Sequence, residues 1–597
     1  MMGKLDVELG MCSLTSRYSP QLLVDEVGTT PADLVALIAR GAEMTAGIAS
    51  FALCLARDNL NSTPDSPELV RKRATELREL LTRLGPCFIK MGQVLGSRPD
   101  IVRDDYMEEL CLLQDDVPAF PDAEAYTEMR AALGPNRRLE DVFSEISARP
   151  VAAASLGQVY KATLRDTGEA VAIKVQRPNV APTIMRDLLI FRSLAWLVNP
   201  LARARLGCDA ELVVDEFGQK LLEELDYRLE ASNIEDFGRN FADDPTVKIP
   251  WVRRDLCSDR MLVMEWIDGA RCTDPDAVRA VCGDAGVEEF IRVGVVSALR
   301  MLLEHGLFHG DPHPGNIFAM PDGRIAYVDF GNVAQLSQAN KQTLIDAVVH
   351  AVNEDYEEMA GDFMRLGFLG AGTDVGPIVP ALEKIWQDSL GQSIQSFNFR
   401  SITLRFNELV YQYPIRIPER YSLVIRSLLT QEGICMTLQP NFHFLEVAYP
   451  YVARRLLTDE DPALRERLIQ VLFDHGRFRW DRLENLVALA GGGGAGSGAG
   501  SGSGVGSDAV GGSGQGLDLT DTVKDALGVL LTDGKLRGQL IGALTEGDRL
   551  HLEEMRSLLA VAGDGVSPVR LAGSLLDDLP KTARKGLLAW SDAVLRA

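Results

Sequence analysis

The sequence lacks the basic excess that nucleic-acid binding requires and the paired cysteines typical of disulfide or zinc proteins. Its 597 residues include 61 basic and 85 acidic side chains, which gives a formal net charge of −24. Binding to nucleic acid depends largely on Lys and Arg neutralising phosphates, so we expect no nucleic-acid partner. The nine cysteines are scattered, and no two of them form a C-x-x-C pair. This spacing argues against a disulfide framework or a zinc site and favours a reducing compartment.

Long apolar runs and a typical targeting segment are also missing. The best uncharged candidate, residues 44–56, is 13 residues long, whereas a helix that spans a bilayer needs about 20. We therefore expect contact with a membrane surface but no crossing. The first thirty residues carry four acidic and two basic side chains, a pattern that resembles neither a secretory signal nor an Arg-rich transit peptide.

What is present is the composition of a globular protein, with 46% hydrophobic and 24% charged residues. A chain of this length exceeds what one hydrophobic core supports, so we expect several structural units. Glycine is unevenly distributed, because 14 of the 54 glycines lie in residues 491–516. That stretch has the composition of a flexible linker, and we expect the helical segment beyond it, 517–597, to dock or move independently.

Hydrophobic periodicity predicts an alternation of helical and sheet-forming regions. The spacing of apolar residues predicts helices over 62–84, 183–237 and 286–305, and again from 337 onward. Two β-like runs at 157–164 and 170–176 are joined by a turn-rich connection, which predicts a hairpin. The stretch 261–269 is typical of a buried strand, and 316–320 with 325–330 predict a second hairpin.

The run from His309 to Gly331 carries the strongest chemical pattern in the chain. Asp311 and Asn316 lie five residues apart in HGDPHPGN, and Asp329 opens a D-F-G tripeptide after the second hairpin. Phosphoryl transfer needs a carboxylate that orients or deprotonates the acceptor and two oxygen ligands for metal ions beside the phosphates. The order predicts Asp311 as the catalytic carboxylate, with Asn316 and Asp329 as metal ligands. His309 and His313 fit either a metal pair or turn residues.

Lys174 lies on the second strand of the first hairpin, within VAIKVQRP. A kinase places the lysine that contacts the α- and β-phosphates at that position. Where a kinase has a glycine-rich loop, this sequence has alanine methyls that limit how closely the backbone approaches phosphates. After Gly331 there is no A-P-E tripeptide and little room for an activation loop. We therefore expect altered nucleotide geometry and doubt a protein substrate.

These motifs together resemble the UbiB/ADCK atypical kinase family, and most closely its plastid and cyanobacterial branch. The resemblance rests on KMGQ, AAASLGQVY, VAIKVQRP, EELDYRLEASN, HGDPHPGN and DFG, and covers roughly residues 62–345. It implies an α+β, bilobal protein-kinase-like fold with an N-terminal helical lid extension and a C-terminal helical extension. Within the lid, it assigns Lys90 and Gln93 a place over the active site.

The resemblance also implies partners for the two lysines and a nucleotide-binding surface. Glu230 matches the glutamate that pairs with Lys174, and the E-x-D element matches Glu224 and Asp226, which are expected to contact Lys90. Met264 is expected to be the gatekeeper, followed by the hinge. The implied nucleotide-contacting residues are Ala152, Ala153, Ala154, Ser155, Gly157, Val159, Ala172, Lys174, Glu224, Asp226, Met264, Glu265, Trp266 and Ile267.

The function implied is that of an atypical kinase or ATPase that binds ATP or ADP with Mg²⁺, or Mn²⁺ in its place. The family context implies a role in isoprenoid-quinone and lipid metabolism at a membrane or lipid-droplet surface, with a prenylquinone-related lipid as ligand and quinone-biosynthesis proteins as partners. The expected location is the chloroplast, at plastoglobules or thylakoids; a membrane-associated bacterial cytoplasmic protein is the alternative.

Two other functions stay open at this point. A nucleotide-binding pseudokinase that scaffolds quinone-biosynthesis enzymes would share the fold, and the alanine-rich loop and lid favour it, whereas the intact Lys174, Asp311, Asn316 and Asp329 oppose it. A small-molecule phosphotransferase would share HGDPHPGN but would not explain KMGQ.

The motifs and composition divide the chain into seven expected segments. They are an N-terminal helical segment (1–60), a helical extension carrying KMGQ (61–145), a kinase-like N-lobe with a helical insertion (146–267), a C-lobe (268–445), C-terminal helices (446–490), the glycine-rich linker (491–516) and a final helical segment (517–597).

Overall fold

A computed structural model gives the fold of the chain. It describes residues 18–390, except 29, 61–65, 97–101, 115–118, 206–208, 353–354 and 371, together with parts of 406–478. The chain divides into two compact units, the first comprising Met1–Val293, His305–Leu336 and Ile417–Ile434, and the second Gly294–Glu304, Ser337–Arg416 and Cys435–Ala597. The predicted linker 491–516 and the segment 517–597 lie outside the described residues.

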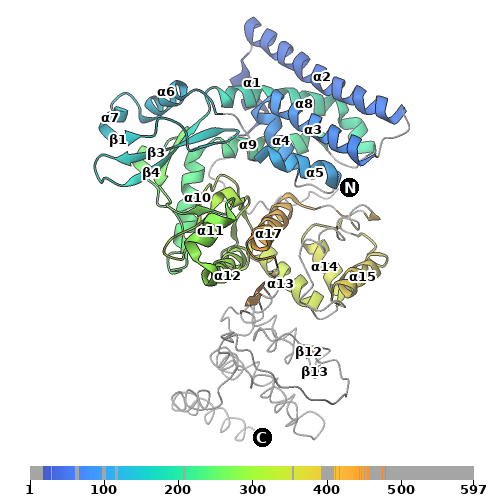
Figure 1. The fold of residues 1–597 in the computed structure, drawn as a ribbon. Coiled ribbons are helices and arrows are strands. Elements are labelled where there is room, and N and C mark those ends of the chain that lie inside the picture. Colours follow the sequence, from blue (N-terminus) through green and yellow to red (C-terminus); the bar gives the residue numbers. More distant parts are fainter. Residues whose placement is uncertain are drawn as a thin grey trace, which may run out of the picture. The chain divides into compact units, whose positions relative to one another are not determined.

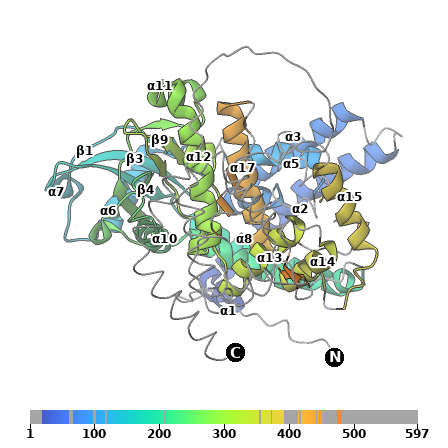
Figure 2. The ribbon, with the colours of Figure 1, turned by 90° about the horizontal axis from the view of Figure 1, so that it is seen from below.

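A five-stranded antiparallel sheet forms the N-lobe of the first unit. The strands follow the order β1–β3–β4–β6, with β2 paired to β3. Their bounds are β1 Phe143–Ile146, β2 Ala152–Ala153, β3 Gly157–Leu164, β4 Ala170–Gln176 and β6 Met261–Glu265. In both Figure 1 and Figure 2, α6 (Asp122–Leu133) and α7 (Leu139–Val142) lie against this sheet. Buried Met129, Tyr160 and Ile173 belong to the core between these layers.

The sheet confirms the first predicted hairpin and the buried strand. β3 and β4 pair over seven residue pairs, from Gly157 opposite Gln176 to Thr163 opposite Ala170. β6 then pairs with β4 and is buried at its first four residues. β1 was not predicted, because four residues are too few for a periodic pattern and the pairing with β3 decides their conformation.

Helices that come before and after strands β1–β4 in the sequence form the lid extension and the helical insertion. Their bounds are α1 Pro20–Val27, α2 Pro31–Leu60, α3 Pro67–Leu84, α4 Pro86–Leu95, α5 Asp104–Cys111, α8 Val180–Arg205, α9 Ala210–Glu224 and α10 Tyr227–Asn240. Helix α3 confirms the predicted helix within 62–84. Figure 1 shows α3, α4 and α5 beside α8.

The connection from α3 to α4 depends on glycine and proline. Gly85 has a φ of 100°, which side-chain-bearing residues rarely adopt, and Pro86 then opens α4 at a position where its missing N–H is not needed. Within α4, a Cβ at Gly92 would overlap the side chains of Leu113 and Leu81. The glycine of KMGQ therefore lets α4 pack closely on α3 and on the turn after α5.

The C-lobe part of the first unit carries short strands and loops around the second predicted hairpin. β9 (Ile317–Ala319) and β10 (Ile325–Tyr327) pair antiparallel, as predicted, although both are shorter than the predicted runs. The other elements of this part are β5 Val247–Lys248, β7 Ala270–Arg271, α11 Pro275–Cys282, β8 Leu307–His309 and β11 Val333–Gln335. Helix α12 Asp284–Arg300, a π-helix Met301–His305 and α17 Glu419–Leu438 each have residues in both units. β8 pairs with β11, so the catalytic-type loop and the D-F-G tripeptide lie between two paired strands.

The second unit is mainly helical where it is described. It contains α13 (Gln338–Val352), α14 (Tyr356–Arg365) and α15 (Ile378–Leu390), and α13 packs against α14. The helical periodicity predicted after 337 is therefore confirmed in these segments. Nδ1 of His350 lies 2.7 Å from the fully buried carboxylate of Asp362, which links α13 to α14.

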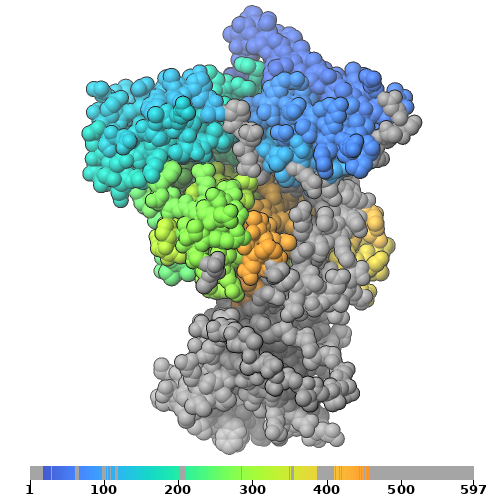
Figure 3. All heavy atoms as spheres, in the orientation of Figure 1, coloured from blue at the N-terminus to red at the C-terminus, as the bar shows by residue number. Residues whose placement is uncertain are grey.

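Two expectations from the sequence need correction. The stretch 446–490 was expected to be helical, but Phe473–Asp474 (β12) and Arg477–Phe478 (β13) pair as antiparallel strands. A membrane crossing was also not expected, because no uncharged run of the sequence is long enough. By length and composition, however, α2 contains an 18-residue window apolar enough to cross, because such a window tolerates two charged residues. Figure 3 shows the upper face of α2, in dark blue, uncovered.

Candidate active site

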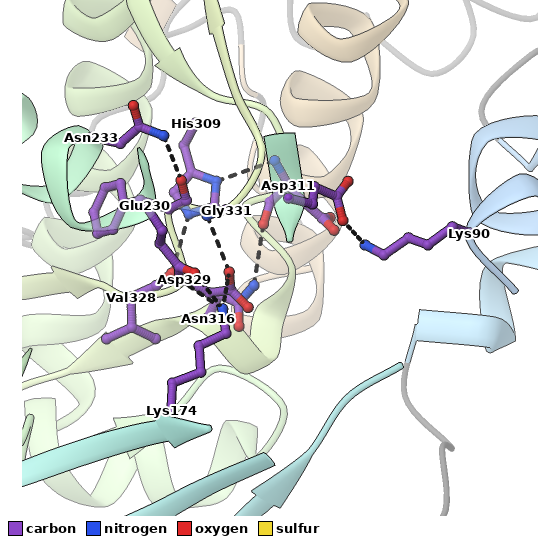
Figure 4. A network of polar contacts seen from close by, with 12 residues as sticks. Lys90, Lys174, Glu230, Asn233, His309, Asp311, Asn316, Val328, Asp329 and Gly331 are labelled. Atoms are coloured by element: carbon purple, nitrogen blue, oxygen red, sulfur yellow. Dashed lines mark hydrogen bonds and ion pairs between the residues drawn. The ribbon is translucent and has the colours of Figure 1, made fainter. Parts of the chain in front are cut away.

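A cleft in the first unit brings together side chains from both lobes and from the lid. Predicted residues that line it are Lys90, Ala154, Ser155, Gly157, Lys174, Glu224, Glu230, Asp311, Asn316 and Asp329. Leu156, Tyr227, Gly331 and Asn332 line it as well and were not predicted. Figure 4 shows Glu230 and Asp329 meeting at Lys174, with Lys90 approaching from the separate helix α4.

Lys174 is the centre of an ion-paired cluster. Its Nζ donates to both carboxylate oxygens of Glu230, at 2.7 and 2.9 Å, and to Oδ1 of Asp329 at 3.0 Å. The side chains of Glu230 and Lys174 are 3% and 12% exposed, whereas that of Asp329 is 41% exposed and open to the cleft. The lysine on β4 thus joins α10 to the D-F-G segment across sequence separations of 56 and 155 residues.

The charges within this cluster are unequal. Burial alone would lower the pKa of Lys174, but Asp329 and Glu230 outweigh it and hold that pKa well above its ordinary value. Partial loss of hydration inside the cleft would by itself raise the pKa of Asp329, but the Lys174 ammonium holds that pKa well below its ordinary value. Burial, helped by Asp329, raises the pKa of Glu230 to about 7 against the attraction of Lys174. Asp329 therefore stays ionised, which its predicted role as a metal ligand requires, and Glu230 gains a proton most readily.

Backbone geometry aims the Asp329 carboxylate at Lys174. Asp329 has a φ of 61°, a left-handed conformation that Asp tolerates better than most residues. The Gly331 N–H donates to Oδ1 of Asp329 at 3.3 Å, and Asn233 of α10 donates to the carbonyl of Phe330 at 2.9 Å. The Phe330 ring is fully buried against Phe237. The D-F-G segment is therefore held on α10, the helix that also supplies Glu230.

His309 holds the catalytic-type loop in place as a neutral imidazole. Its Nδ1 accepts from the Asp311 N–H at 3.1 Å, so its Nε2 donates to the carbonyl of Val328 at 3.2 Å. Burial lowers the pKa of His309, which favours this neutral form. His313 accepts from the Gly315 N–H with its Nδ1. Of the two interpretations of these histidines, turn residues fit the structure, and the described residues contain no cluster of three metal-binding side chains of the His, Cys, Asp and Glu type.

Asn316 and Asp329 present oxygen atoms suited to a hard divalent cation. Nδ2 of Asn316 donates to the Asp311 carbonyl at 3.4 Å, which turns its Oδ1 away from that contact. The Val328 N–H donates to the Asn316 carbonyl at 2.9 Å, so the two predicted ligands are joined through the backbone. An amide oxygen and a carboxylate fit Mg²⁺, which keeps several water or phosphate ligands.

Lys90 crosses the cleft from α4 to pair with Glu224 at the end of α9. The contact predicted for Glu224 is present. The Asp226 side chain accepts from the Arg228 N–H and caps α10. Gln93 does not line the cleft: its Nε2 donates to the carbonyl of Leu113 at 3.0 Å and fixes α4 to the turn after α5. Lys90 thus faces the site, and Gln93 supports the helix that carries it.

Some of the expected loop residues line the cleft, and the expected hinge residues do not. Ala154, Ser155 and Gly157 line the cleft, whereas Ala152 and Ala153 form β2 and pair with Val159 and Gln158 of β3. Ala172 and the predicted gatekeeper Met264 are buried opposite each other in the sheet. The hinge residues are not part of the cleft lining. Glu265 pairs with Lys248, the backbone N–H of Trp266 donates to the carbonyl of Ala170, and Ile267 is buried.

Arg426 is a neighbour of the site that sequence reasoning missed. It lies on α17, and its guanidinium donates to the carbonyl of Gly310 at 2.8 Å and lies 3.7 Å from Oδ1 of Asp311. No local motif marks it, because it follows Asp311 by more than a hundred residues. The contact orders the loop and places a positive charge beside the predicted catalytic carboxylate.

Replacing Arg426 by glutamine is expected to lower the turnover number for ATP about tenfold, the equivalent of one hydrogen bond in a charged setting. The KM for ATP should change little, because Arg426 acts on Asp311 and not on the residues around Lys174. Steady-state kinetics checks this, with Arg420→Gln on an exposed part of the same helix as the control. Unchanged turnover with a lowered melting temperature would make Arg426 a structural residue only.

Comparison with known proteins places these features in context. A family model described as the ABC1 atypical kinase-like domain matches residues 112–363. The chain is 58% identical over 594 residues to the Arabidopsis thaliana protein named Activity of BC1 Complex Kinase 1, chloroplastic, covering 99% of this chain and 85% of that protein. It is 47% identical over 503 residues to an uncharacterized protein of Synechocystis sp., covering 84% of each.

A further chloroplastic Arabidopsis relative, Activity of BC1 Complex Kinase 3, is 41% identical over 479 residues, covering 80% of this chain and 66% of that protein. The expected resemblance to plastid and cyanobacterial relatives is thereby confirmed. These matches support a chloroplast location, which the acidic N-terminal sequence alone did not indicate.

Proposed function

This chain belongs to the ABC1 atypical kinase-like family, and from that premise we propose that it is an Mg²⁺-dependent kinase or ATPase acting in prenylquinone or related lipid metabolism. The observation that carries the proposal is the bridge from Lys174 to Glu230 and Asp329 in a cleft that also holds Asp311 and Asn316. These are the phosphate-binding, metal-binding and acceptor-orienting groups that phosphoryl transfer requires.

Each side chain has a distinct role in this proposal. Lys174, oriented by Glu230, would bind the α- and β-phosphates of ATP. Asn316 and Asp329 would hold Mg²⁺, which when bound neutralises charge on the phosphates. Asp311 would orient the acceptor hydroxyl or water and take its proton as the γ-phosphoryl group passes to that oxygen and ADP leaves.

A membrane or lipid-droplet surface is the proposed site of action, and α2 supports it. Only Met44 of this 30-residue helix is buried, and its large exposed apolar side chains are spread from Leu34 to Leu60. They are Leu34, Val35, Ile38, Ile48, Leu53 and Leu60, each 46–83% exposed. Such a surface is unusual in a protein that only faces water. We propose that α2 lies on a plastoglobule or thylakoid surface and brings the cleft near a lipid acceptor.

The basic cluster at 71–78 contributes less to such binding than its sequence indicates. Arg73 pairs with Asp58 and Glu76, and Arg78 pairs with Glu109 at 2.9 Å. Since these guanidinium groups are already matched by carboxylates, attraction to anionic lipid would depend on the remaining exposed side chains and on the apolar surface of α2.

A nucleotide-binding scaffold without phosphoryl transfer is the second candidate. The Lys90–Glu224 pair, which spans the cleft, favours it, because the lid residue occupies space beside the phosphate-binding groups. Both functions predict binding of Mg-nucleotide, and only the enzyme predicts turnover of ATP.

The test is ATP hydrolysis by the purified full chain with and without vesicles of galactolipid and a prenylquinone headgroup mimic. If the protein is an enzyme, we expect Mg²⁺-dependent release of ADP that increases with lipid and is lost in Asp329→Asn. Nucleotide binding seen as a thermal shift, with no turnover under any condition, would favour the scaffold. Turnover that persists in Asp329→Asn would refute the assignment of the site.

A further inference from the structure

The hydroxyl of Tyr227 is a buried polar group without a partner. Tyr227 opens α10, is 1% exposed, and its hydroxyl accepts and donates no hydrogen bond among the described residues. Its side chain nevertheless lines the cleft. Buried hydroxyl groups are normally paired, because an unpaired one loses its hydration without compensation. An unpaired hydroxyl on a side chain that lines a cleft is therefore a candidate donor to a ligand in that cleft.

The position of this hydroxyl points to the phosphate end of a ligand. The Nζ of Lys174 lies 5.4 Å from the centroid of the Tyr227 ring, and Glu230 follows three residues later on the same face of α10. A Cβ at Gly157 would overlap the Tyr227 hydroxyl and the Val175 carbonyl. The hydroxyl thus lies directly beneath Gly157, between the end of the alanine-rich loop and the predicted phosphate-binding lysine.

One backbone amide of the loop above Tyr227 is not available to a phosphate. The Ala154 N–H donates to the Gly157 carbonyl at 2.8 Å, so the turn is closed by its own hydrogen bond. Backbone amides of such loops are the usual phosphate donors. A donor from another element would replace the amide of Ala154.

The charge in the cleft favours a neutral donor. Its lining contains four carboxylates, Glu224, Glu230, Asp311 and Asp329, and two ammonium groups, Lys90 and Lys174. A further lysine would be an additional charge for these carboxylates to pair with, whereas a hydroxyl adds a donor without changing the charge of the cleft. Burial raises the pKa of Tyr227 well above its ordinary value, so its proton is retained over the physiological range.

We propose that the Tyr227 hydroxyl donates a hydrogen bond to a phosphate oxygen of the nucleotide bound at Lys174, in place of a donor that the closed alanine-rich loop does not provide. The inference rests on the proposed nucleotide function and adds a binding residue to it. It names a nucleoside di- or triphosphate, recognised at its phosphates, as the ligand of this part of the cleft.

Tyr227→Phe removes the hydroxyl and keeps the ring that packs beside Lys174. We expect its affinity for Mg-ADP, measured by titration calorimetry, to fall about 10- to 100-fold, as for a lost hydrogen bond to a charged group. Affinity for adenosine, which has no phosphate, should not change. Without ligand, the variant should melt at the wild-type temperature or higher, because it no longer buries an unpaired hydroxyl.

Tyr126→Phe is the matched control. The Tyr126 hydroxyl donates to the Ser147 carbonyl at 3.2 Å, away from the cleft, so its loss should lower the melting temperature without changing ADP affinity. The proposal for Tyr227 is overturned if Tyr227→Phe binds Mg-ADP like the wild type, or if it loses adenosine affinity by the same factor. Wild-type protein that binds no Mg-nucleotide would refute the proposed function and this inference with it.

Discussion

Replacing Asp311 by asparagine is expected to lower the ATP turnover number about 10²- to 10⁴-fold, the usual loss when a general base is removed. The side chain is 32% exposed, and its backbone is held by His309, so the loop should keep its shape when only the charge is removed. Affinity for Mg-ADP should stay near the wild-type value, because Asp311 acts on the acceptor. Hydrolysis kinetics and titration calorimetry on the same protein samples check both parts.

The control for this prediction is Asp276→Asn on α11, whose side chain is 96% exposed and pairs only with Arg279 among the ion pairs of the described residues. It should leave turnover unchanged. A contrasting variant, Asp329→Asn, should lose both turnover and Mg²⁺-dependent affinity, since Asp329 is the proposed metal ligand. If Asp311→Asn turned over ATP at the wild-type rate, Asp311 would have no role as a base and the remaining groups would have to orient water by themselves.

Replacing Lys174 by methionine is expected to destabilise the protein by about 3 kcal/mol, near the lower end of the range for breaking a buried ion pair. Methionine fills much of the same space, so the cost arises from leaving the carboxylate of Glu230, which is 3% exposed, without a counter-ion. The carboxylate of Asp329 adds less to this loss of stability, because it is 41% exposed and reaches water in the cleft. Urea unfolding in metal-free buffer measures the change.

The loss of stability in Lys174→Met should grow with pH. The pKa of Glu230 is already about 7 in the folded wild type, raised from an ordinary value of 4.5 by burial. A carboxyl whose folded pKa is raised binds more protons when folded, so its contribution to stability declines as pH increases from 4.5 through 7. Without Lys174 that pKa rises further, and the penalty should be larger at pH 8 than at pH 6.

A double replacement separates charge from packing in this prediction. Lys174→Met combined with Glu230→Gln removes both members of the pair, and it should recover much of the lost stability while remaining inactive. Lys161→Met on the exposed part of β3 serves as the control and should change stability little. Equal destabilisation by the single and double variants would mean that Lys174 stabilises the lobe through packing alone.

The part of the site that sequence alone predicted is the part encoded locally. Asp311, Asn316 and Asp329 lie within nineteen residues, and the β9–β10 hairpin between them folds back on itself. Because a hairpin fixes the relation of its two ends, spacing in the sequence carries most of the geometry. The first hairpin places Lys174 on its second strand for the same reason.

Pairings between distant segments came from the family resemblance and not from spacing. The contacts of Lys174 with Glu230 and of Lys90 with Glu224 join residues 56 and 134 positions apart. Neither periodicity nor charge pattern selects these partners among many acidic residues on α9 and α10. The resemblance gave a lysine and a glutamate that pair in each case. It also placed Gln93 over the active site, whereas the Gln93 side chain donates to the carbonyl of Leu113 and fixes α4.

The sequence by itself determined the lobes, the two hairpins and the identity of the groups suited to phosphoryl transfer, since these depend on short-range patterning and on residue type. The tertiary structure decided which side chains reach the cleft. Arg426 arrives on α17, and the Tyr227 hydroxyl is left unpaired beneath Gly157, only because separate helices pack around the same loop. Such contacts between distant segments depend on packing across the fold, so no local sequence pattern predicts them.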